Sequence, residues 1–124
     1  MTPLEEMMQV ASDLRQVVDD IERLKTRIGG RRYKTDDGEI HLVLGSEGRY
    51  KKAWIEAHTT STVTYPERTV AEHKNAADAH AFALWAAWTA DKAALDSAKE
   101  KAHSYRQILS AGQTAARVES DLSR

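Results

Sequence analysis

The second half of the chain, from Thr69 to Leu122, constrains the fold most because it has the composition of one long helix. It contains sixteen alanines between Ala71 and Ala116, no proline, and Gly112 as its only glycine. At a rise of about 1.5 Å per residue, fifty helical residues are roughly 75 Å long. A helix of that length cannot bury its own apolar face. It therefore needs a partner helix, either from this chain or from another copy.

The large residues of this segment recur at alternating steps of three and four, the heptad spacing of packed helices. The positions are Leu84, Trp88, Leu95, Ala98, Ala102, Tyr105, Leu109 and Ala116, with Asp91 and Gly112 as the exceptions. Trp85, Trp88 and Phe82 are interpreted as a node of helix packing rather than a ligand site. We expect self-association through a face that comprises Leu84, Trp85, Trp88, Leu95, Tyr105 and Leu109.

The N-terminal segment, Pro3 to Ile28, is predicted to be an amphipathic helix with its own heptad pattern. Thr2 suits the N-cap, and Gly29 suits the left-handed position after the last turn. This helix would be about 39 Å long and would pair antiparallel with about half of the long one. We expect the rest of the long helix to be buried between subunits.

The middle segment, 29–66, changes character. Asp37-Gly38 between two short polar–apolar arms, Arg32–Thr35 and Glu39–Leu44, predicts a β-hairpin. Gly45–Gly48 is interpreted as a second turn, and Arg49–His58 is ambiguous between a strand and a short helix. The β-branched run Thr59–Tyr65 favours a strand.

These elements predict an α+β protein that is mostly α. The expected order is an N-terminal helix over 1–28, a β-hairpin or meander over 29–66, and a long helix over 69–122 with coiled-coil-like packing. Thr69 and Glu72 form a capping-box pattern at the start of the long helix. On length alone, the 124 residues form a single elongated domain.

Composition excludes several classes of protein. A net charge of −1 argues against a strongly basic nucleic-acid coat, and the lack of cysteine excludes disulfides and thiolate metal sites. The longest uncharged stretch, Ala79–Ala90, is too short to span a bilayer. Glu5 and Glu6 lie where a signal peptide would be basic. We expect a cytoplasmic protein without membrane contact.

Basic and aromatic residues gather in the middle segment, a combination that binds single-stranded nucleic acid through phosphate contacts and base stacking. The candidate nucleic-acid-binding residues are Arg31, Arg32, Tyr33, Lys34, Arg49, Tyr50, Lys51, Lys52 and Trp54. The two clusters, placed on neighbouring arms of a small sheet, would form one wall of a groove. The alternative is that the rings pack the sheet against the helices and the cations form a solvated rim.

No pattern of catalytic residues is present, so we expect no enzyme, no catalytic residue, no cofactor and no small-molecule substrate. The chain has no phosphate-binding glycine loop and no nucleophile motif. His73 and His80 are two helical turns apart, too far to share a metal without further ligands. We therefore predict no metal site, and the histidines are interpreted as solvated or interface residues.

The layout resembles the UvsY-type recombination mediators of phages. The resemblance rests on the basic turn Gly29-Gly30-Arg31-Arg32-Tyr33, the tryptophans Trp85 and Trp88, and the stretch Ala102–Gln113. It implies a ring- or barrel-like homo-oligomer built on the C-terminal helices. Such a protein would bind single-stranded DNA and help to load a recombinase in place of a single-strand-binding protein. The basic–aromatic turn is the candidate DNA contact.

The function expected from the sequence is a non-enzymatic accessory factor that self-assembles and binds single-stranded DNA in phage-type recombination or replication. Its partners would be itself, single-stranded DNA, and a recombinase or single-strand-binding protein, in the host cytoplasm if the chain is phage-encoded. Two alternatives remain open at this point. One is a small adaptor that binds a partner protein through its helix faces, and the other is a structural assembly protein.

Overall fold

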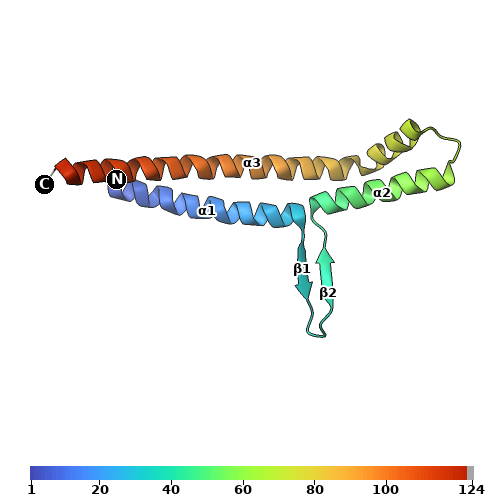
Figure 1. Ribbon diagram of the computed structural model, residues 1–124, viewed down its shortest axis with the longest axis horizontal. Coiled ribbons are helices and arrows are strands. Elements are labelled where there is room, and N and C mark those ends of the chain that lie inside the picture. Colours follow the sequence, from blue (N-terminus) through green and yellow to red (C-terminus); the bar gives the residue numbers. More distant parts are fainter. Residues whose placement is uncertain (123–124) are drawn as a thin grey trace. The chain divides into compact units, whose positions relative to one another are not determined.

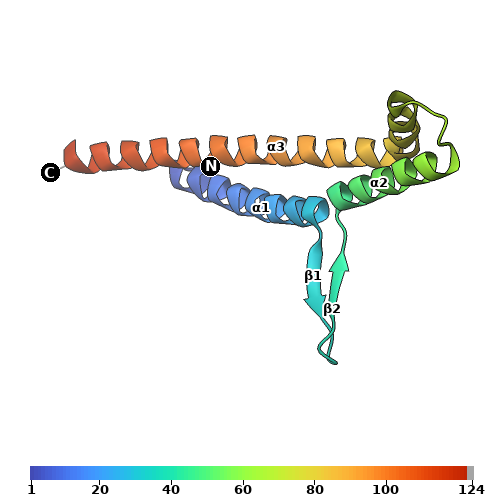
Figure 2. The ribbon, with the colours of Figure 1, turned by 45° about the vertical axis from the view of Figure 1, so that its right-hand side comes forward.

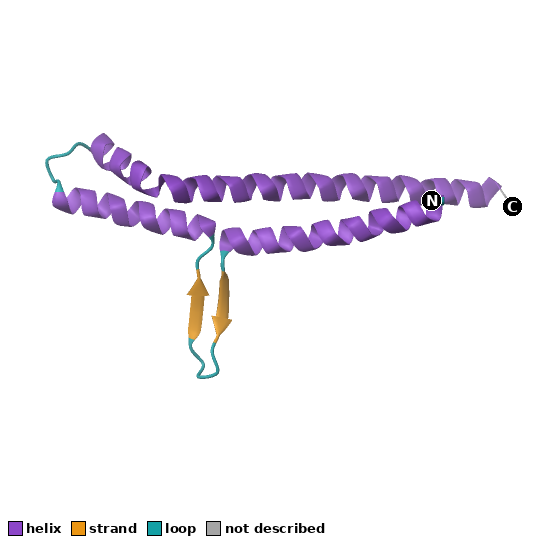
Figure 3. Ribbon diagram, turned by 180° about the vertical axis from the view of Figure 1, so that it is seen from behind, coloured by secondary structure: helices purple, strands orange, loops and turns teal. Residues whose placement is uncertain are grey.

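The computed structural model describes residues 1–122, which form three helices and one two-stranded antiparallel sheet (Figure 1). The elements in chain order are α1 (Pro3–Gly29), β1 (Arg31–Lys34), β2 (Ile40–Val43), α2 (Ser46–Thr64) and α3 (Val70–Leu122). Helix dominates this part of the chain, and the hairpin is its only sheet (Figure 3). The expected mostly α fold with a small β part is confirmed.

Capping residues begin and end helix α1 at, or one residue from, the positions that the sequence predicts. The Thr2 hydroxyl accepts a hydrogen bond from the backbone N–H of Glu5 at 3.2 Å, so Thr2 is the N-cap. The C-terminal cap differs by one residue. Gly29 is the last helical residue, and Gly30 takes the left-handed conformation, with a φ of +79°. Its N–H bonds the Thr26 carbonyl at 2.7 Å, which closes the helix.

The predicted hairpin is confirmed, with Arg31 paired to Val43 and Lys34 paired to Ile40. Its turn is closed by a hydrogen bond of 2.8 Å from the Thr35 N–H to the Glu39 carbonyl. Gly38 has a φ of +87°, a conformation that glycine adopts at little cost. Asp37-Gly38 therefore lies in the hairpin turn that the sequence predicted.

Helix α2 corrects two of the expectations from the sequence and resolves the stretch that was left open. Gly45–Gly48 is not a separate turn, because Gly45 is the N-cap and Ser46 is the first helical residue. The ambiguous stretch Arg49–His58 is helical. The strand expected over Thr59–Tyr65 is wrong, because the helix continues to Thr64.

The physical reason lies in how α2 places its side chains. The inward positions Tyr50, Trp54, Ala57 and Ser61 recur at helical spacing, whereas the β-branched residues that suggested a strand are exposed. Intrinsic strand preference is weak and yields to packing against another element. The sequence of residues 59–65 shows the preference for a strand but not the packing that overrides it.

Helix α3 begins with the predicted capping box. The Glu72 N–H bonds the Thr69 hydroxyl at 3.2 Å, and the Glu72 carboxylate accepts from the Thr69 N–H at 3.4 Å. The helix continues without a break through Gly112 to Leu122. The predicted heptad positions from Leu84 to Gly112 are all buried or half-buried. The heptad register read from the sequence therefore marks the inward face of this helix.

The chain divides into two compact units, and α1 and α3 contribute to both. Unit 1 comprises Met1–Arg23 and the chain from Leu95 onward, and unit 2 comprises Leu24–Ala94. In unit 1 the buried core consists of Val17, Ile21 and Ala102, with Leu14, Leu95, Ala98 and Tyr105 packed against it. α1 and the C-terminal part of α3 are thus partner helices, as their heptads predicted.

In unit 2 the partner of α3 is α2, which corrects a further expectation. From the sequence, this half of the long helix is expected to be buried between subunits. In the structure, Ala77 and Ala81 are fully buried in the same chain. The Tyr50 ring of α2 stacks on Trp88 with ring centroids 5.4 Å apart. Small side chains on the inward faces allow such helices to approach closely.

No helix within residues 1–122 is both long and apolar enough to cross a membrane.

Candidate functional site

The two basic–aromatic clusters lie on different kinds of element. Arg31, Arg32, Tyr33 and Lys34 form strand β1, whereas the cluster from Arg49 to Trp54 lies on helix α2. The expectation that they occupy neighbouring arms of one sheet is wrong, because the second segment packs as a helix. A groove with both clusters on a single sheet wall is therefore not present.

The first cluster is divided between the two faces of the hairpin. Side chains alternate along a strand, and directly paired residues share a face. Arg32 and Lys34 therefore share one face with Leu42 and Ile40, to which they are paired. The other face carries Arg31 and Tyr33 with their partners.

Tyr33 on that other face is already stacked. Its ring lies 5.2 Å from the His41 ring, at an interplanar angle of 16°. The Arg31 guanidinium is 5.7 Å from the Tyr33 ring centroid, a cation–π distance. The aromatic ring of the hairpin and most of its positive charge therefore point to opposite sides.

The turn of the hairpin is acidic. Asp36, Asp37 and Glu39 follow the cations of β1, so positive and negative charges are equal in number over 31–43. The Thr35 hydroxyl and the Glu39 N–H both donate to the Asp37 carboxylate. These hydrogen bonds, the Thr35 bond first, lower the pKa of Asp37 below its ordinary value. Asp37 thus keeps its negative charge in moderately acidic solution.

The rings of the second cluster hold α2 against α3. Tyr50 stacks on Trp88, and the Trp54 Nε1–H donates to Asp78 Oδ1 at 2.7 Å. Trp54 also stacks on His58 with centroids 5.0 Å apart. The alternative interpretation of the sequence, in which these rings pack the sheet against the helices, holds only in that Tyr50 and Trp54 pack against a helix, because both lie on α2 and not on the sheet.

The cations of the second cluster are exposed. Lys51 forms an ion pair with Glu47 at 2.7 Å within the same helix. Arg49 and Lys52 have no ion-pair partner within the described part of the chain.

One face of the hairpin combines exposed aliphatic residues with cations. We call Arg32, Lys34, Ile40 and Leu42 the hairpin patch. Ile40 is 72% exposed and Leu42 is 59% exposed. In unit 2 the hairpin projects away from α2, and the views in Figures 1 and 2 agree on this. Large aliphatic side chains on a projecting ribbon form a surface that can bind another molecule.

Glycines hold the base of the hairpin together. A Cβ atom built on Gly45 would lie 2.2 Å from the Ile28 carbonyl oxygen and 2.5 Å from the Gly30 N. A Cβ built on Gly30 would lie 2.2 Å from the Val43 carbonyl oxygen. The backbones at the two feet of the hairpin are therefore closer than any other residue type permits. No residue pattern in the sequence distinguished Gly45 from an ordinary turn glycine.

The residues expected at an oligomer interface have different surroundings. Leu95 and Tyr105 pack against the core of unit 1, and Trp88 packs against Tyr50. Leu84 and Leu109 are half-buried. Trp85 is 43% exposed, and it lies beside Phe82, which is 63% exposed. Of the expected set, Trp85 is the member best placed to contact another molecule.

A buried polar cluster joins α2 to the start of α3, and the sequence analysis did not find it. Ser61 Oγ and His73 Nδ1 form a hydrogen bond of 2.7 Å, and both residues are buried. Arg68 Nη1 donates to the same hydroxyl at 3.2 Å, and its guanidinium lies 3.8 Å from the Tyr65 ring centroid. His73 was interpreted as solvated or interfacial. Its spacing of four from Ala77 and eight from Ala81 is the signal that places it on the inward face.

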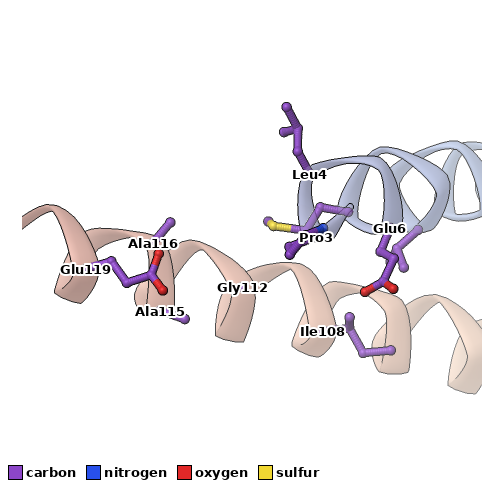
Figure 4. Close-up of a pocket in the computed structure, with 10 residues that line it drawn as sticks. Pro3, Leu4, Glu6, Ile108, Gly112, Ala115, Ala116 and Glu119 are labelled. Carbon is purple, nitrogen blue, oxygen red and sulfur yellow. The ribbon is translucent and has the colours of Figure 1, made fainter. Parts of the chain in front are cut away.

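Unit 1 contains an apolar groove where the start of α1 meets the end of α3. Pro3, Leu4 and Glu6 lie opposite Ile108, Gly112 and Ala115 (Figure 4). The groove has a volume of about 510 Å³. Gly112 lets α1 approach, because a Cβ there would lie 2.8 Å from the Met7 Cε. The glycine that interrupts the heptad pattern thus makes room for a methionine.

Comparisons with known proteins identify no relative: no family model, no curated protein and no solved structure matches the chain. Among residues 1–122, no group of three or more histidine or carboxylate side chains is arranged to hold a metal ion.

Proposed function

We propose that this protein is a non-enzymatic adaptor that uses the hairpin patch to bind a partner protein. The observation that carries the proposal is the exposure of Ile40 and Leu42 on a hairpin that projects away from α2. A two-stranded hairpin has no interior in which to bury them. A partner surface would remove this apolar area from water and stabilise the complex.

The chemistry of the patch favours a protein partner that is apolar at its centre and acidic at its edge. Arg32 and Lys34 flank the aliphatic pair and lie on the same face. Arginine is common in protein interfaces, whereas base stacking needs flat rings. The only ring of β1, Tyr33, lies on the opposite face and stacks on His41. The patch thus suits an apolar, acidic surface better than a single strand of nucleic acid.

The test is an affinity purification from the source cell, with an Ile40→Ser, Leu42→Ser variant beside the unchanged chain. Val63→Ser is the matched control, because Val63 is 76% exposed on α2. We expect one partner to be retained by the unchanged chain and the control and lost by the hairpin variant. Purified partner should then bind with the same order of affinities. Equal retention by all three proteins would contradict the proposal, provided that their circular dichroism spectra agree.

Single-stranded DNA binding in recombination or replication is a second candidate, with the chain acting in the cytoplasm as a loading factor for a recombinase. It is supported by the exposure of Arg31, Arg32, Tyr33 and Lys34 along a single strand. The equal number of acidic residues over 31–43 weakens it, because phosphate affinity depends on net positive charge.

Fluorescence anisotropy of a labelled oligonucleotide at about 50 mM salt tests this candidate, since phosphate contacts are strong there. Substitution of Arg31, Arg32 and Lys34 by alanine should abolish binding. The same number of alanine substitutions at the exposed cations Lys74, Lys99 and Arg106 should leave most of it. No binding by the unchanged chain, or equal losses in the two variants, would eliminate the candidate.

A further inference from the structure

A small pocket in unit 2 is lined by three aromatic rings and one carboxylate. Its residues are Tyr50 of α2 and Asp78, Phe82 and Trp85 of α3, and its volume is about 300 Å³. The α3 residues are spaced four and three apart, so they lie on one face of the helix. This size is at the lower end of the range for ligand pockets and suits a head group rather than a large molecule.

The rings are held in place but not covered. Tyr50 is fixed by its stack on Trp88, with ring centroids 5.4 Å apart. Phe82 and Trp85 lie 5.9 Å apart with an interplanar angle of 31°. Both α3 rings are exposed, so their surfaces are available to a ligand. The Phe82 and Trp85 rings would stabilise the fold if they were buried in its core. Their exposure at this pocket instead indicates that they have a function.

The carboxylate gives the pocket its charge. Asp78 Oδ1 accepts a hydrogen bond of 2.7 Å from Trp54 Nε1, which fixes the side chain. Asp78 forms no ion pair with any residue of the described chain. Lys51, Lys74 and Lys92 form no ion pair with Asp78, and the Lys92 and Lys51 ammonium groups lie 3.8 Å and 5.9 Å from the Trp88 ring centroid. The wall of the pocket thus carries a negative charge without a cationic partner.

We infer that this pocket binds a quaternary ammonium group. Aromatic rings attract cations through their negative faces, and a group that is poorly hydrated gives up little hydration on entry. The carboxylate at the wall adds attraction for positive charge and none for a neutral apolar molecule. A primary ammonium is more strongly hydrated and would bind more weakly. The inference does not depend on the hairpin or on the proposed function.

The test is a titration of the full ¹⁵N-labelled chain with choline, observed by NMR at the indole N–H of Trp85. We expect a saturable shift. The neutral isostere 3,3-dimethylbutan-1-ol has the same shape without the charge, and it should bind at least about fivefold more weakly, as loss of one cation–π contribution of about 1 kcal/mol implies. A peptide that contains trimethyllysine distinguishes a side-chain ligand from a free one.

Two variants test the assigned residues. Asp78→Asn removes the charge and retains an acceptor for Trp54, and we expect it to weaken choline binding at least about fivefold. Trp85→Leu should abolish saturable binding, observed at the indole N–H of Trp54. Asp96→Asn, at an exposed position on α3, is the matched control and should bind normally. An unchanged indole N–H signal of Trp88, which stacks on Tyr50, shows that the packing of α2 on α3 survives.

Three results would overturn the inference. The first is the absence of a saturable shift with both choline and the trimethyllysine peptide. The second is equal affinity for choline and the neutral isostere, which would indicate an apolar site. The third is choline binding by Asp78→Asn as tight as that of the unchanged chain, with the Trp88 signal intact.

Discussion

Individual residues determine where the elements of this chain meet. Gly45 and Gly30 bring the feet of the hairpin together, and Gly112 makes room for Met7 in unit 1. Ser61 links His73 and Arg68 inside the α2–α3 contact. The three glycines and Ser61 are small residues. Each lies against atoms that are distant in the sequence and that leave no room for a larger side chain or depend on its hydrogen bond. Substitutions at this scale therefore test the tertiary contacts directly.

Gly45→Ala should destabilise the protein. Its Cβ would lie 2.2 Å from the Ile28 carbonyl oxygen, and backbone atoms cannot move aside as a flexible side chain can. We expect the free energy of unfolding, measured by chemical denaturation, to fall by about 1–3 kcal/mol or more.

Gly29→Ala is the matched control for that substitution, because nothing lies within 4 Å of a Cβ at Gly29. It should be neutral or stabilise the helix by about 0.5–1 kcal/mol. Equal effects of the two substitutions would mean that the base of the hairpin is not tightly packed.

Ser61→Ala should cost about 1–3 kcal/mol, because it leaves the buried His73 Nδ1 without its hydrogen-bond partner. Thr62→Ala, one residue away, removes an exposed hydroxyl that bonds only its own helix at the His58 carbonyl. It should change stability by no more than about 0.5 kcal/mol. Thermal unfolding of both variants measures the difference. A Ser61→Ala protein as stable as Thr62→Ala would show that the buried cluster contributes nothing.

Elements differ in how much of their stability is local. α1 and α3 have caps and a continuous inward face, whereas the hairpin has only its own turn and the glycine base. At the turn, Asp37 holds Thr35 and Glu39 through its ionised carboxylate. The hairpin is therefore the element whose structure depends most on one titrating side chain.

This dependence predicts an acid-sensitive turn. The pKa of Asp37 is lowered in the folded hairpin, so its contribution is fully present above the unfolded value of about 3.9. The contribution is lost as the pH falls through the lowered folded value. The backbone amide shift of Glu39, followed by NMR from pH 6 down to about 2, should therefore change with a midpoint below about 3.9.

Asp37→Asn retains an acceptor and removes the charge, so this transition should disappear in that variant. A midpoint at or above the unfolded value in the unchanged chain would contradict the assignment of the hydrogen bonds at the turn.

At the scale of the whole molecule, the question is what remains for another copy to contact. The residues expected to join subunits are largely used within the chain, since Leu95 and Tyr105 pack in unit 1 and Trp88 packs on Tyr50. Phe82 and Trp85 are exposed and remain available. If the protein self-associates, as the heptads predicted, Trp85 is the member of the expected interface that can carry the contact, together with the neighbouring Phe82.

Light scattering measures this directly, because one chain has a mass of 13.9 kDa. A homo-oligomer held by the aromatic pair should dissociate to that mass when Phe82 and Trp85 are both replaced by serine. Replacement of the exposed Val118 and Ile108 of unit 1 by serine is the comparison. Dissociation in the unit 1 variant alone would place self-association at the groove near Gly112 instead. A mass of one chain for the unchanged protein would refute self-association.

The sequence by itself determined the features that depend on neighbouring residues. Thr2, the Asp37-Gly38 pair and the Thr69–Glu72 box start, turn or cap their elements within a few residues. The heptad spacing of α3 marked its inward face, because the helical period converts spacing into direction.

Only the tertiary structure decided the rest. The stretch Thr59–Thr64 is helical because α2 packs its inward face on α3, whereas the β-branched residues of the stretch itself favour a strand. The same packing buries His73, engages Tyr50 and Trp54, and separates the two basic clusters that the sequence had joined. These outcomes depend on contacts between residues far apart in the chain, and local preference is too weak to specify them.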